Sequence, residues 1–428
     1  MSSINFDSHL AALKDRFAET PDSIILKADV LREGLRYTRE LSEIAQWAIP
    51  SGAFLSREDV PEGEESAEYV LGVPNQIILG DDTRINTELD RNSPYTVRKD
   101  GEARHVLCRH ETAVAAVSFP RRALFTETLS DGSAVFDALG QRAEGCVALA
   151  HSIFCEYAKN NDQCAFCFLG NAMAGMTLAD ISAEDLPTPT QSIEACEVAA
   201  RAGMNIIHIV VSGGAFVNTS LEAKSYAKTI RKLREAVGPK PRITAVCQAF
   251  DEQGWLLLKD AGADRVQPNL EVWDEALWRE IVPGKAKALG KREWLKRLES
   301  AVDIFGVGEV ATNFVAGAEL LSRNFGGLED VFETHLEGYA FLLSHGIVPI
   351  FGFLTKARGT RYENVELPPT EFYLSLGWER TKLMEEFGMY NRYRGGIDSD
   401  FSCYKCVTHK TCQDYPRLLK LNTQHAAR

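Results

Sequence analysis

The second half of the chain alternates between short apolar runs and longer runs with helical spacing. The apolar runs at 146–154, 205–211, 242–248, 264–270, 308–316 and 347–353 predict strands. Between them, apolar residues repeat every three or four positions, which predicts helices at 190–202, 221–237, 252–261, 274–281, 291–304 and 328–345. Gly203, Gly262 and Gly346 stand where helices should stop. Six such repeats predict a parallel sheet that closes into a barrel or part of one.

The first 143 residues have a different pattern. Residues 1–50 show helical spacing until Pro50-Ser-Gly interrupts it. From 69 to 135, short strand-like runs alternate with turn signals, and Lys99-Asp-Gly indicates a hairpin. A further helical run follows the repeats at 370–387. We therefore expect an α/β protein in three parts, namely a helical and β-rich N-terminal region (1–143), a partial (βα)6 TIM-like barrel (144–360) and a C-terminal extension (361–428).

Composition narrows the class of protein. The chain has 428 residues, of which 45% are hydrophobic, as is ordinary for a globular protein with a full core. Its net charge of −13 argues against a nucleic-acid partner, which requires clustered Lys and Arg. No apolar stretch is long enough to span a membrane, and the N-terminus does not look like a secretory signal. Ten cysteines without a signal indicate a reducing compartment, so we expect a cytoplasmic protein.

Three of these cysteines lie close together after the first predicted strand of the repeats. Cys155, Cys164 and Cys167 are separated by eight and then two residues. Three thiolates on one loop can hold three irons of a cubane and leave the fourth iron open to an outside ligand. The carboxyl ends of barrel strands are where chemistry is expected, and Cys155 follows the strand at 146–154 directly. The loop is therefore a candidate catalytic metal site.

This loop, with the aromatic Phe166 before its last cysteine, resembles that of the radical S-adenosylmethionine (SAM) enzymes, although their commonest spacing is three and then two. The resemblance implies a [4Fe–4S] cluster on Cys155, Cys164 and Cys167, with SAM bound at the open iron. One-electron reduction, from a donor such as flavodoxin or ferredoxin, would cleave SAM to a 5′-deoxyadenosyl radical. That radical would abstract hydrogen from a small-molecule substrate.

Two later segments resemble SAM-contacting segments of the same superfamily. The second strand ends in Ser212-Gly213-Gly214, where the superfamily has Gly-Gly-Glu, although a tight turn explains the glycines equally well. Asn269-Leu-Glu271 resembles a segment of the group containing biotin synthase, methylornithine synthase and the hydrogenase maturases. A surface strand is the plainer interpretation of its polar alternation.

The fifth strand resembles a further SAM-contacting region of the superfamily. The resemblance lies in the position of the strand and in its residues Gly317 and Glu319. Thr312 and Asn313 could bond a ribose or carboxylate, or serve only the strand's own hydrogen bonds.

Substrate contacts are predicted from the polar positions that could face a barrel lumen. Arg265 and Gln267 alternate with apolar residues in the fourth strand and suggest an anionic or amide-bearing substrate. His208 has the same parity as Ser212 in the second strand, although a histidine in this setting is more often part of the core.

The C-terminal extension holds a second group of cysteines. Cys403, Cys406 and Cys412 share one short segment. A second iron–sulfur cluster is the leading interpretation, and zinc with His409 as a fourth ligand is the rival.

With two clusters, the resemblance implies sulfur insertion or rearrangement of a carbon skeleton. One alternative is a radical SAM enzyme that modifies peptides, with the β-rich region holding the peptide. The alternative of another class is a zinc protein whose barrel binds a metabolite without radical chemistry.

Overall fold

The computed structural model describes residues 4–51, 72–101, 104–123, 125–167, 169, 186–322, 326–357 and 359–389. The second cysteine group, Cys403, Cys406 and Cys412, and also His409, lie outside the described residues. None of the helices in the described ranges is both long and apolar enough to span a bilayer.

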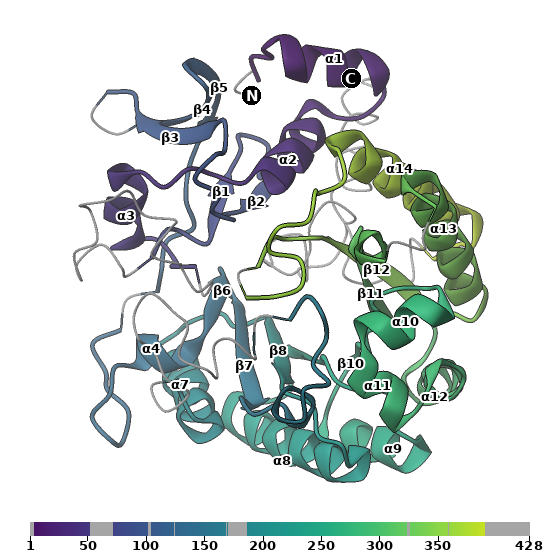
Figure 1. Cartoon of the computed structure of the whole chain (residues 1–428). Helices are drawn as coiled ribbons and strands as arrows, with labels where there is room; N and C mark the ends of the chain where they lie inside the picture. The colour runs from purple at the N-terminus through teal and green to yellow at the C-terminus, as the bar shows by residue number, and fades with distance from the viewer. Residues whose placement is uncertain are drawn as a thin grey trace.

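Parallel strands form the centre of the molecule (Figure 1). One sheet has the order β10-β9-β8-β7-β6, in which β7 to β10 are parallel and β6 is antiparallel to β7. The parallel pair β11–β12 continues this arrangement, because isolated parallel bridges join Val266 to Val310 and Glu271 to Phe314. The strands are β6 (Gln141–Ala143), β7 (Cys146–Ser152), β8 (His208–Gly213), β9 (Arg242–Ala245), β10 (Arg265–Val266), β11 (Ala311–Ala316) and β12 (Val348–Phe353).

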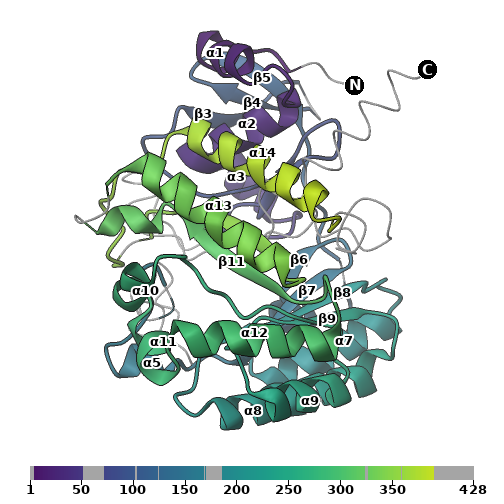
Figure 2. The same ribbon diagram turned by 90° about the vertical axis from the view of Figure 1, so that its right-hand side faces the viewer.

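Helices alternate with these strands and cover their outer side (Figures 1 and 2). Each predicted helix of the repeats is found within one or two residues of its expected ends. The glycines also act as predicted: Gly262 ends α9 with φ of 100°, a conformation that glycine adopts at least cost. The helices are α4 (Val135–Leu139), α5 (Glu156–Lys159), α7 (Pro189–Arg201), α8 (Thr219–Val237), α9 (Glu252–Ala261), α10 (Glu275–Ile281), α11 (Pro283–Ala288), α12 (Lys291–Phe305), the 3-10 helix η2 (Ala318–Leu321) and α13 (Leu328–Ser344).

The N-terminal region is helical first and then β-rich, as the sequence predicts. Its strands form an antiparallel pair, β1–β2, and an antiparallel sheet of β3, β4 and β5, and the expected hairpin joins β3 to β4. The elements are α1 (Ser8–Arg16), α2 (Asp22–Glu33), α3 (Arg39–Ala45), β1 (Gln76–Ile78), β2 (Arg84–Asn86), β3 (Tyr95–Lys99), β4 (His105–Arg109) and β5 (Thr112–Val117).

The helix α14 (Thr370–Glu386) returns from the repeats to the N-terminal region and packs beside α2 (Figures 1 and 2). Asp29 of α2 is fully buried there and accepts hydrogen bonds from the Thr370 hydroxyl and the Tyr95 hydroxyl, each at 2.6 Å. These bonds satisfy a carboxylate that would otherwise be costly to bury. The three-part division of the chain stays a prediction, and the bond from Thr370 to Asp29 shows that the N-terminal region and the C-terminal extension are in contact.

Two expectations about the repeats need correction. The predicted strand 264–270 is a strand only at Arg265–Val266. Gln267 still bonds to the Ala245 carbonyl, and residues 268–271 then turn away from β9 and run along β11. The gap between the helices at 274–281 and 291–304 holds an additional helix, α11. Among the described strands, no pairing joins β12 back to β6 or β7, so the sheet is open there.

Candidate active site

The cysteine loop begins directly after β7. Cys155 precedes the single turn of α5, and the Lys159 N–H donates to its carbonyl at 3.1 Å. Further along, the Cys167 N–H donates to the Cys164 carbonyl at 3.0 Å, so the Cys-x-x-Cys segment forms a tight turn. Phe166, inside this turn, is partly buried against the hydrophobic core. The loop is therefore folded and supported by the core at the carboxyl end of β7.

Residues after β10 hold the cysteine loop from the other side. The Ala165 N–H donates to the Ile281 carbonyl at 2.8 Å, and the Gly284 N–H donates to the Asp162 carbonyl at 3.0 Å. A Cβ on Gly284 would lie 2.4 Å from Cγ of Tyr157, so only glycine permits this approach of α11 to α5. The junction of α10 and α11 thus fixes where the cysteine loop lies.

The thiols of the loop sit in a buried and electrostatically unusual environment. Burial raises the pKa of Cys167 to about 11 and raises that of Cys164 further, with the other thiols adding to the effect. Lys285 opposes this rise for both thiols, because its positive charge favours thiolates. These cysteines are not in disulfides. Buried free thiols beside one cation are donors that a metal can deprotonate and bind.

The thiols do not converge on one point. Within the described ranges, no three His, Cys, Asp or Glu side chains are placed to bind a single ion together. In a cubane, however, each thiolate binds a different iron, so convergence is not required. The donor set of Cys155, Cys164 and Cys167 therefore fits an iron–sulfur cluster in its chemistry.

The glycines at the end of β8 bring the backbone close to the cysteine loop. A Cβ on Gly214 would lie 2.1 Å from the Phe154 carbonyl oxygen and 2.6 Å from the Cys155 nitrogen. Gly213, with φ of 147°, would likewise place a Cβ 2.4 Å from the Ser152 carbonyl oxygen. Ser212 is only half-buried beside them. The structure thus gives these glycines a role in packing β8 against the segment that carries Cys155.

The predicted SAM-contacting segment after β10 is held against β11. Thr312 is fully buried, and its hydroxyl donates to the Pro268 carbonyl at 2.9 Å and accepts from the Leu270 N–H at 2.8 Å. The Asn313 N–H donates to Oδ1 of Asn269 at 3.2 Å. Thr312 and Asn313 therefore act as supports that fix the position of Asn269 and of its neighbour Glu271.

Glu271 has two features that the sequence does not reveal. Its φ of 75° is in the left-handed region, which is strained for a non-glycine residue and is common at functional sites. Its carboxylate also accepts a hydrogen bond from Nζ of Lys285 at 2.8 Å, and the same Nζ donates to the Asn269 carbonyl at 2.8 Å. Burial lowers the pKa of Lys285, but Glu271 and the Cys164 thiol outweigh that effect and raise it. Lys285 remains a cation between the predicted SAM contacts and the thiols.

Glu222 in the first turn of α8 is a second buried group that sequence reasoning missed. Its carboxylate accepts from the Phe216 N–H at 2.7 Å and from Nε2 of Gln248 at 2.6 Å. Gln248 in turn accepts from the Tyr157 hydroxyl at 2.6 Å. Burial raises the pKa of Glu222 to about 7, although these hydrogen bonds lower it. The network ties the segments after β8 and β9 to α5 of the cysteine loop.

Gly317 and Glu319 follow the carboxyl end of β11, where the chain enters the 3-10 helix η2. A Cβ on Gly317 would meet Cγ of Pro368 at 2.6 Å. The Glu319 carboxyl is fully buried 3.4 Å from Nδ1 of His335 on α13, and burial raises its pKa to about 8. Burial also lowers the pKa of His335 to about 3. The structure thus places Glu319 next to the outer helix α13.

The three predicted substrate residues are not brought together. His208 is the first residue of β8, is buried, and hydrogen bonds to the Thr244 hydroxyl at 3.0 Å. Arg265 begins β10 and pairs with Glu309 at 3.3 Å. Both lie at the amino ends of their strands, whereas the cysteine loop follows a carboxyl end. Gln267 alone reaches the site, where its Nε2 donates to Oδ1 of Asn269 at 3.1 Å.

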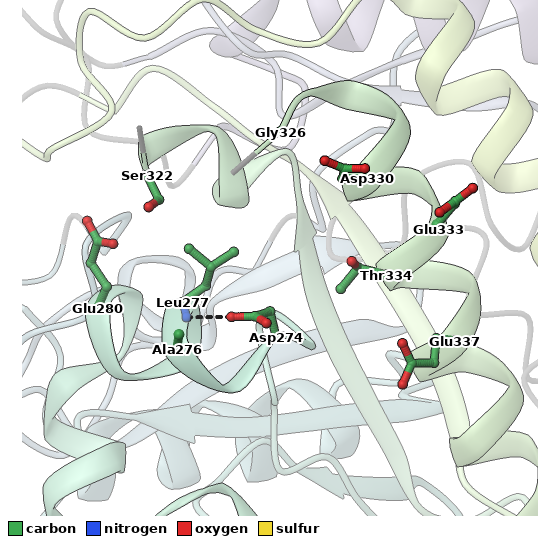
Figure 3. A pocket seen from close by; sticks show the side chains of 10 residues that line it. All are labelled: Asp274, Ala276, Leu277, Glu280, Ser322, Gly326, Asp330, Glu333, Thr334 and Glu337. Atoms are coloured by element: carbon green, nitrogen blue, oxygen red, sulfur yellow. Dashed lines mark hydrogen bonds between the residues drawn. The ribbon is translucent and has the colours of Figure 1, made fainter. Parts of the chain in front are cut away.

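A separate pocket of about 940 Å³ opens between α10 and α13 (Figure 3). The Asp274 carboxylate, on its wall, caps α10 by accepting from the Leu277 N–H at 2.8 Å. No residue predicted for the site lines this pocket, so it is distinct from the cysteine loop. Half of the residues that line it are acidic. The lining residues are Asp274, Ala276, Leu277, Glu280, Ser322, Gly326, Asp330, Glu333, Thr334 and Glu337.

Comparison with known proteins gives one curated relative and several solved structures. No family model matches the chain. The chain is 26% identical over 238 residues to bacteriochlorophyllide c C-7(1)-hydroxylase of Chlorobaculum limnaeum, an alignment that covers 52% of this chain. The chain spans about half (55%) of the length of that relative.

Two solved structures are similar to this chain over part of its length. Methylornithine synthase matches with a TM-score of 0.38 and 14% identity, covering 55% of this chain and 62% of the other. Coproporphyrinogen III oxidase from Escherichia coli, described as a radical SAM enzyme, matches with a TM-score of 0.37 and 13% identity, covering 59% and 55%.

Proposed function

We propose that this chain is a radical SAM enzyme that acts on a small molecule. The observation that carries the proposal is the loop of Cys155, Cys164 and Cys167, folded at the carboxyl end of β7 with free, partly buried cysteines. When bound there, SAM on a [4Fe–4S] cluster supplies, after one-electron reduction, a carbon radical that removes a hydrogen atom from the substrate. We further propose that β7 to β12 are the six strands of a partial TIM-like barrel around this site.

The chain's own residues would position SAM and the substrate. Asn269 and Glu271 stand on a segment that Thr312 holds rigidly, which suits a contact with the cofactor. The Gly213–Gly214 backbone fixes the Cys155 segment from β8. Gln267 is the proposed substrate contact, because it lies beside Asn269, whereas His208 and Arg265 lie at the other strand ends.

A more specific part of the proposal concerns the reaction that follows removal of hydrogen from the substrate. Sulfur insertion or rearrangement of a carbon skeleton would follow if the tail residues Cys403, Cys406 and Cys412 hold a second iron–sulfur cluster. Hydroxylation at a C–H carbon is the second candidate, and the relative of 26% identity, which is named for such a reaction, favours it. Both begin with removal of hydrogen from carbon.

The proposal is tested by anaerobic reconstitution with iron and sulfide, followed by incubation with SAM and dithionite. We expect a brown protein that releases 5′-deoxyadenosine and methionine. Cys164→Ala should abolish release, whereas Cys196→Ala, which removes a fully buried thiol of α7, should retain it. A colourless protein that binds zinc and leaves SAM intact would refute the proposal and favour the zinc-binding alternative.

A further inference from the structure

Glu222 is a buried carboxyl group near the cysteine loop that the proposed function does not use. It lies in the first turn of α8 but is only 1% exposed, whereas a glutamate usually faces solvent. Its carboxylate accepts hydrogen bonds from the Phe216 N–H and from the side chain and backbone of Gln248. Lys285, the cation whose charge acts on it, bonds to Glu271 instead. A carboxylate buried without an ion-pair partner holds a proton more firmly than one in water.

A short chain of hydrogen bonds joins this carboxylate to the cysteine loop. Nε2 of Gln248 donates to Oε2 of Glu222 at 2.6 Å, and Oε1 of Gln248 accepts from the Tyr157 hydroxyl at 2.6 Å. Tyr157 belongs to α5, between the predicted ligands Cys155 and Cys164. Burial raises the pKa of Tyr157, and the negative charge of Glu222 adds to the rise. Cys164 and Cys155 act on Tyr157 in the same direction, so the loop and Glu222 influence one buried hydroxyl.

Lys285 gives a second link between Glu222 and the predicted cluster ligands. Its positive charge lowers the pKa of Glu222, against the larger effect of burial. It has the same effect on the thiols of Cys164 and Cys167. Charges in a protein interior interact more strongly than charges in water and are screened less by salt. We therefore expect a change of charge at the cysteine loop to change the affinity of Glu222 for a proton.

Several ionisable side chains packed around α8 stay uncharged near neutral pH. Burial raises the pKa of Tyr226, on α8 itself, and of Cys247, after β9, well above their ordinary values. Burial lowers the pKa of His151, which stacks on Tyr226 from β7, to about 4. Burial raises the pKa of Cys196, the buried thiol of α7, to about 12.

The remaining neighbours of Glu222 come from α5, α9 and α11. The Tyr157 hydroxyl of α5 has a raised pKa and stays protonated, and Lys285 of α11 stays a cation. The Asp251 carboxylate caps α9 by accepting from the Gly254 N–H at 2.9 Å. Burial raises the pKa of Glu222 to about 7. Among the groups with shifted pKa in this neighbourhood, Glu222 is thus the one whose charge changes near neutral pH.

We propose that the chain takes up a proton at the Glu222 carboxyl when one electron enters at the cysteine loop. This inference rests on the proposed function, which requires a reducible iron–sulfur cluster on Cys155, Cys164 and Cys167. The one-electron reductant that the proposed function already needs supplies the electron, and solvent supplies the proton. An O–H bond forms on the carboxylate, and no other bond forms or breaks. The negative charge gained at the loop is offset by the negative charge lost at Glu222.

Potentiometric titration of the reconstituted chain at several pH values tests this inference. The titration follows the paramagnetic resonance signal that SAM perturbs in a parallel sample, which separates it from any cluster on the tail cysteines. The midpoint potential should fall as pH rises above about 7. The expected slope is up to about 59 mV per pH unit, which is a tenfold change in the equilibrium constant for a one-electron couple. A midpoint potential that stays constant between pH 6 and pH 9 would overturn the inference.

The variant Glu222→Gln assigns the proton to this residue. Because its side chain is uncharged at every pH, it should keep the midpoint potential that the unmodified chain has at pH 6. The matched control is Glu235→Gln, the same change at an exposed position of α8, which should leave the pH dependence as it is. A pH dependence that persists in Glu222→Gln would assign the proton to another group and refute the inference.

Infrared difference spectroscopy of the unmodified chain gives a test that does not depend on the folding of a variant. Reduction at pH 8 should produce the C=O band of a newly protonated carboxyl group, and the absence of that band would contradict the inference. A chain that binds no reducible cluster would refute the proposed function, and the inference with it. A chain whose cluster is reducible but whose potential ignores pH would refute the inference alone.

Discussion

Lys285 and Glu271 form a nearly buried ion pair beside the cysteine loop, with 2.8 Å between Nζ and Oε1 and side chains that are 11% and 8% exposed. The pair joins α11 to the segment after β10, and the same lysine interacts electrostatically with the thiols of Cys164 and Cys167. One cation thus links the predicted SAM contacts to the predicted cluster ligands.

Replacing Lys285 should destabilise the folded chain. Lys285→Met leaves the Glu271 carboxylate buried without its partner, so we expect the free energy of unfolding to fall by about 3 kcal/mol. Lys287→Met is the control, because Lys287 is 69% exposed and pairs with Asp162 at the surface, where pairs contribute under about 1 kcal/mol. Urea unfolding followed by circular dichroism measures both. Equal losses for the two variants would show that the Lys285 pair is no more than a surface pair.

Glu222 should make stability depend on pH. Its pKa is about 7 in the folded chain, compared with an ordinary value of 4.5, so the folded state binds more protons between these values. The contribution of Glu222 to the free energy of unfolding should therefore fall as pH rises from about 4.5 to about 7. Above that range the contribution should change little. Glu222→Gln should flatten this part of the profile while keeping acceptors for Phe216 and Gln248. Unfolding midpoints at pH 5.5 and 8 test this, and an unchanged difference between them in the variant would count against it.

Gly214→Ala should damage the cysteine loop specifically. The added Cβ meets backbone atoms of Phe154 and Cys155, which cannot rotate away, so the Cys155 segment must move. We expect reduced iron incorporation in anaerobic reconstitution. Gly203→Ala is the control: Gly203 has φ of 94°, but nothing lies within 4 Å of its added Cβ. Iron content that falls equally in both variants would assign the effect to backbone strain.

The tail cysteines offer a separate prediction. If they hold a second cluster with a role in turnover, Cys406→Ala should leave dithionite-driven SAM cleavage near normal while it lowers the iron content and alters the substrate product. Iron analysis, together with the yield of 5′-deoxyadenosine, measures this. Wild-type iron content in Cys406→Ala would refute the second cluster.

Apolar periodicity and the stop signals at glycines were enough to predict the strands and helices of the repeats. They failed after β10, where the alternation of polar residues predicted a strand to residue 270. There the Thr312 hydroxyl replaces a ladder hydrogen bond, and Glu271 adopts a strained φ, neither of which a residue pattern reveals.

The burial of Lys285 and Glu222 at the site could not be predicted from the sequence, for a related reason. A lysine or glutamate in a short amphipathic stretch usually faces solvent. Only the fold shows that Lys285 is brought to Glu271 and that Glu222 is covered by the segments after β8 and β9.

Electron paramagnetic resonance of the reduced protein tests the central claim most directly. The sample is the variant Cys403→Ala/Cys406→Ala/Cys412→Ala, which leaves Cys155, Cys164 and Cys167 as the proposed cluster ligands. The account predicts the signal of one reduced [4Fe–4S] cluster, which changes in shape when SAM is added, because SAM binds the open iron. A chain without that signal, or with a signal that SAM leaves unaltered, would contradict it.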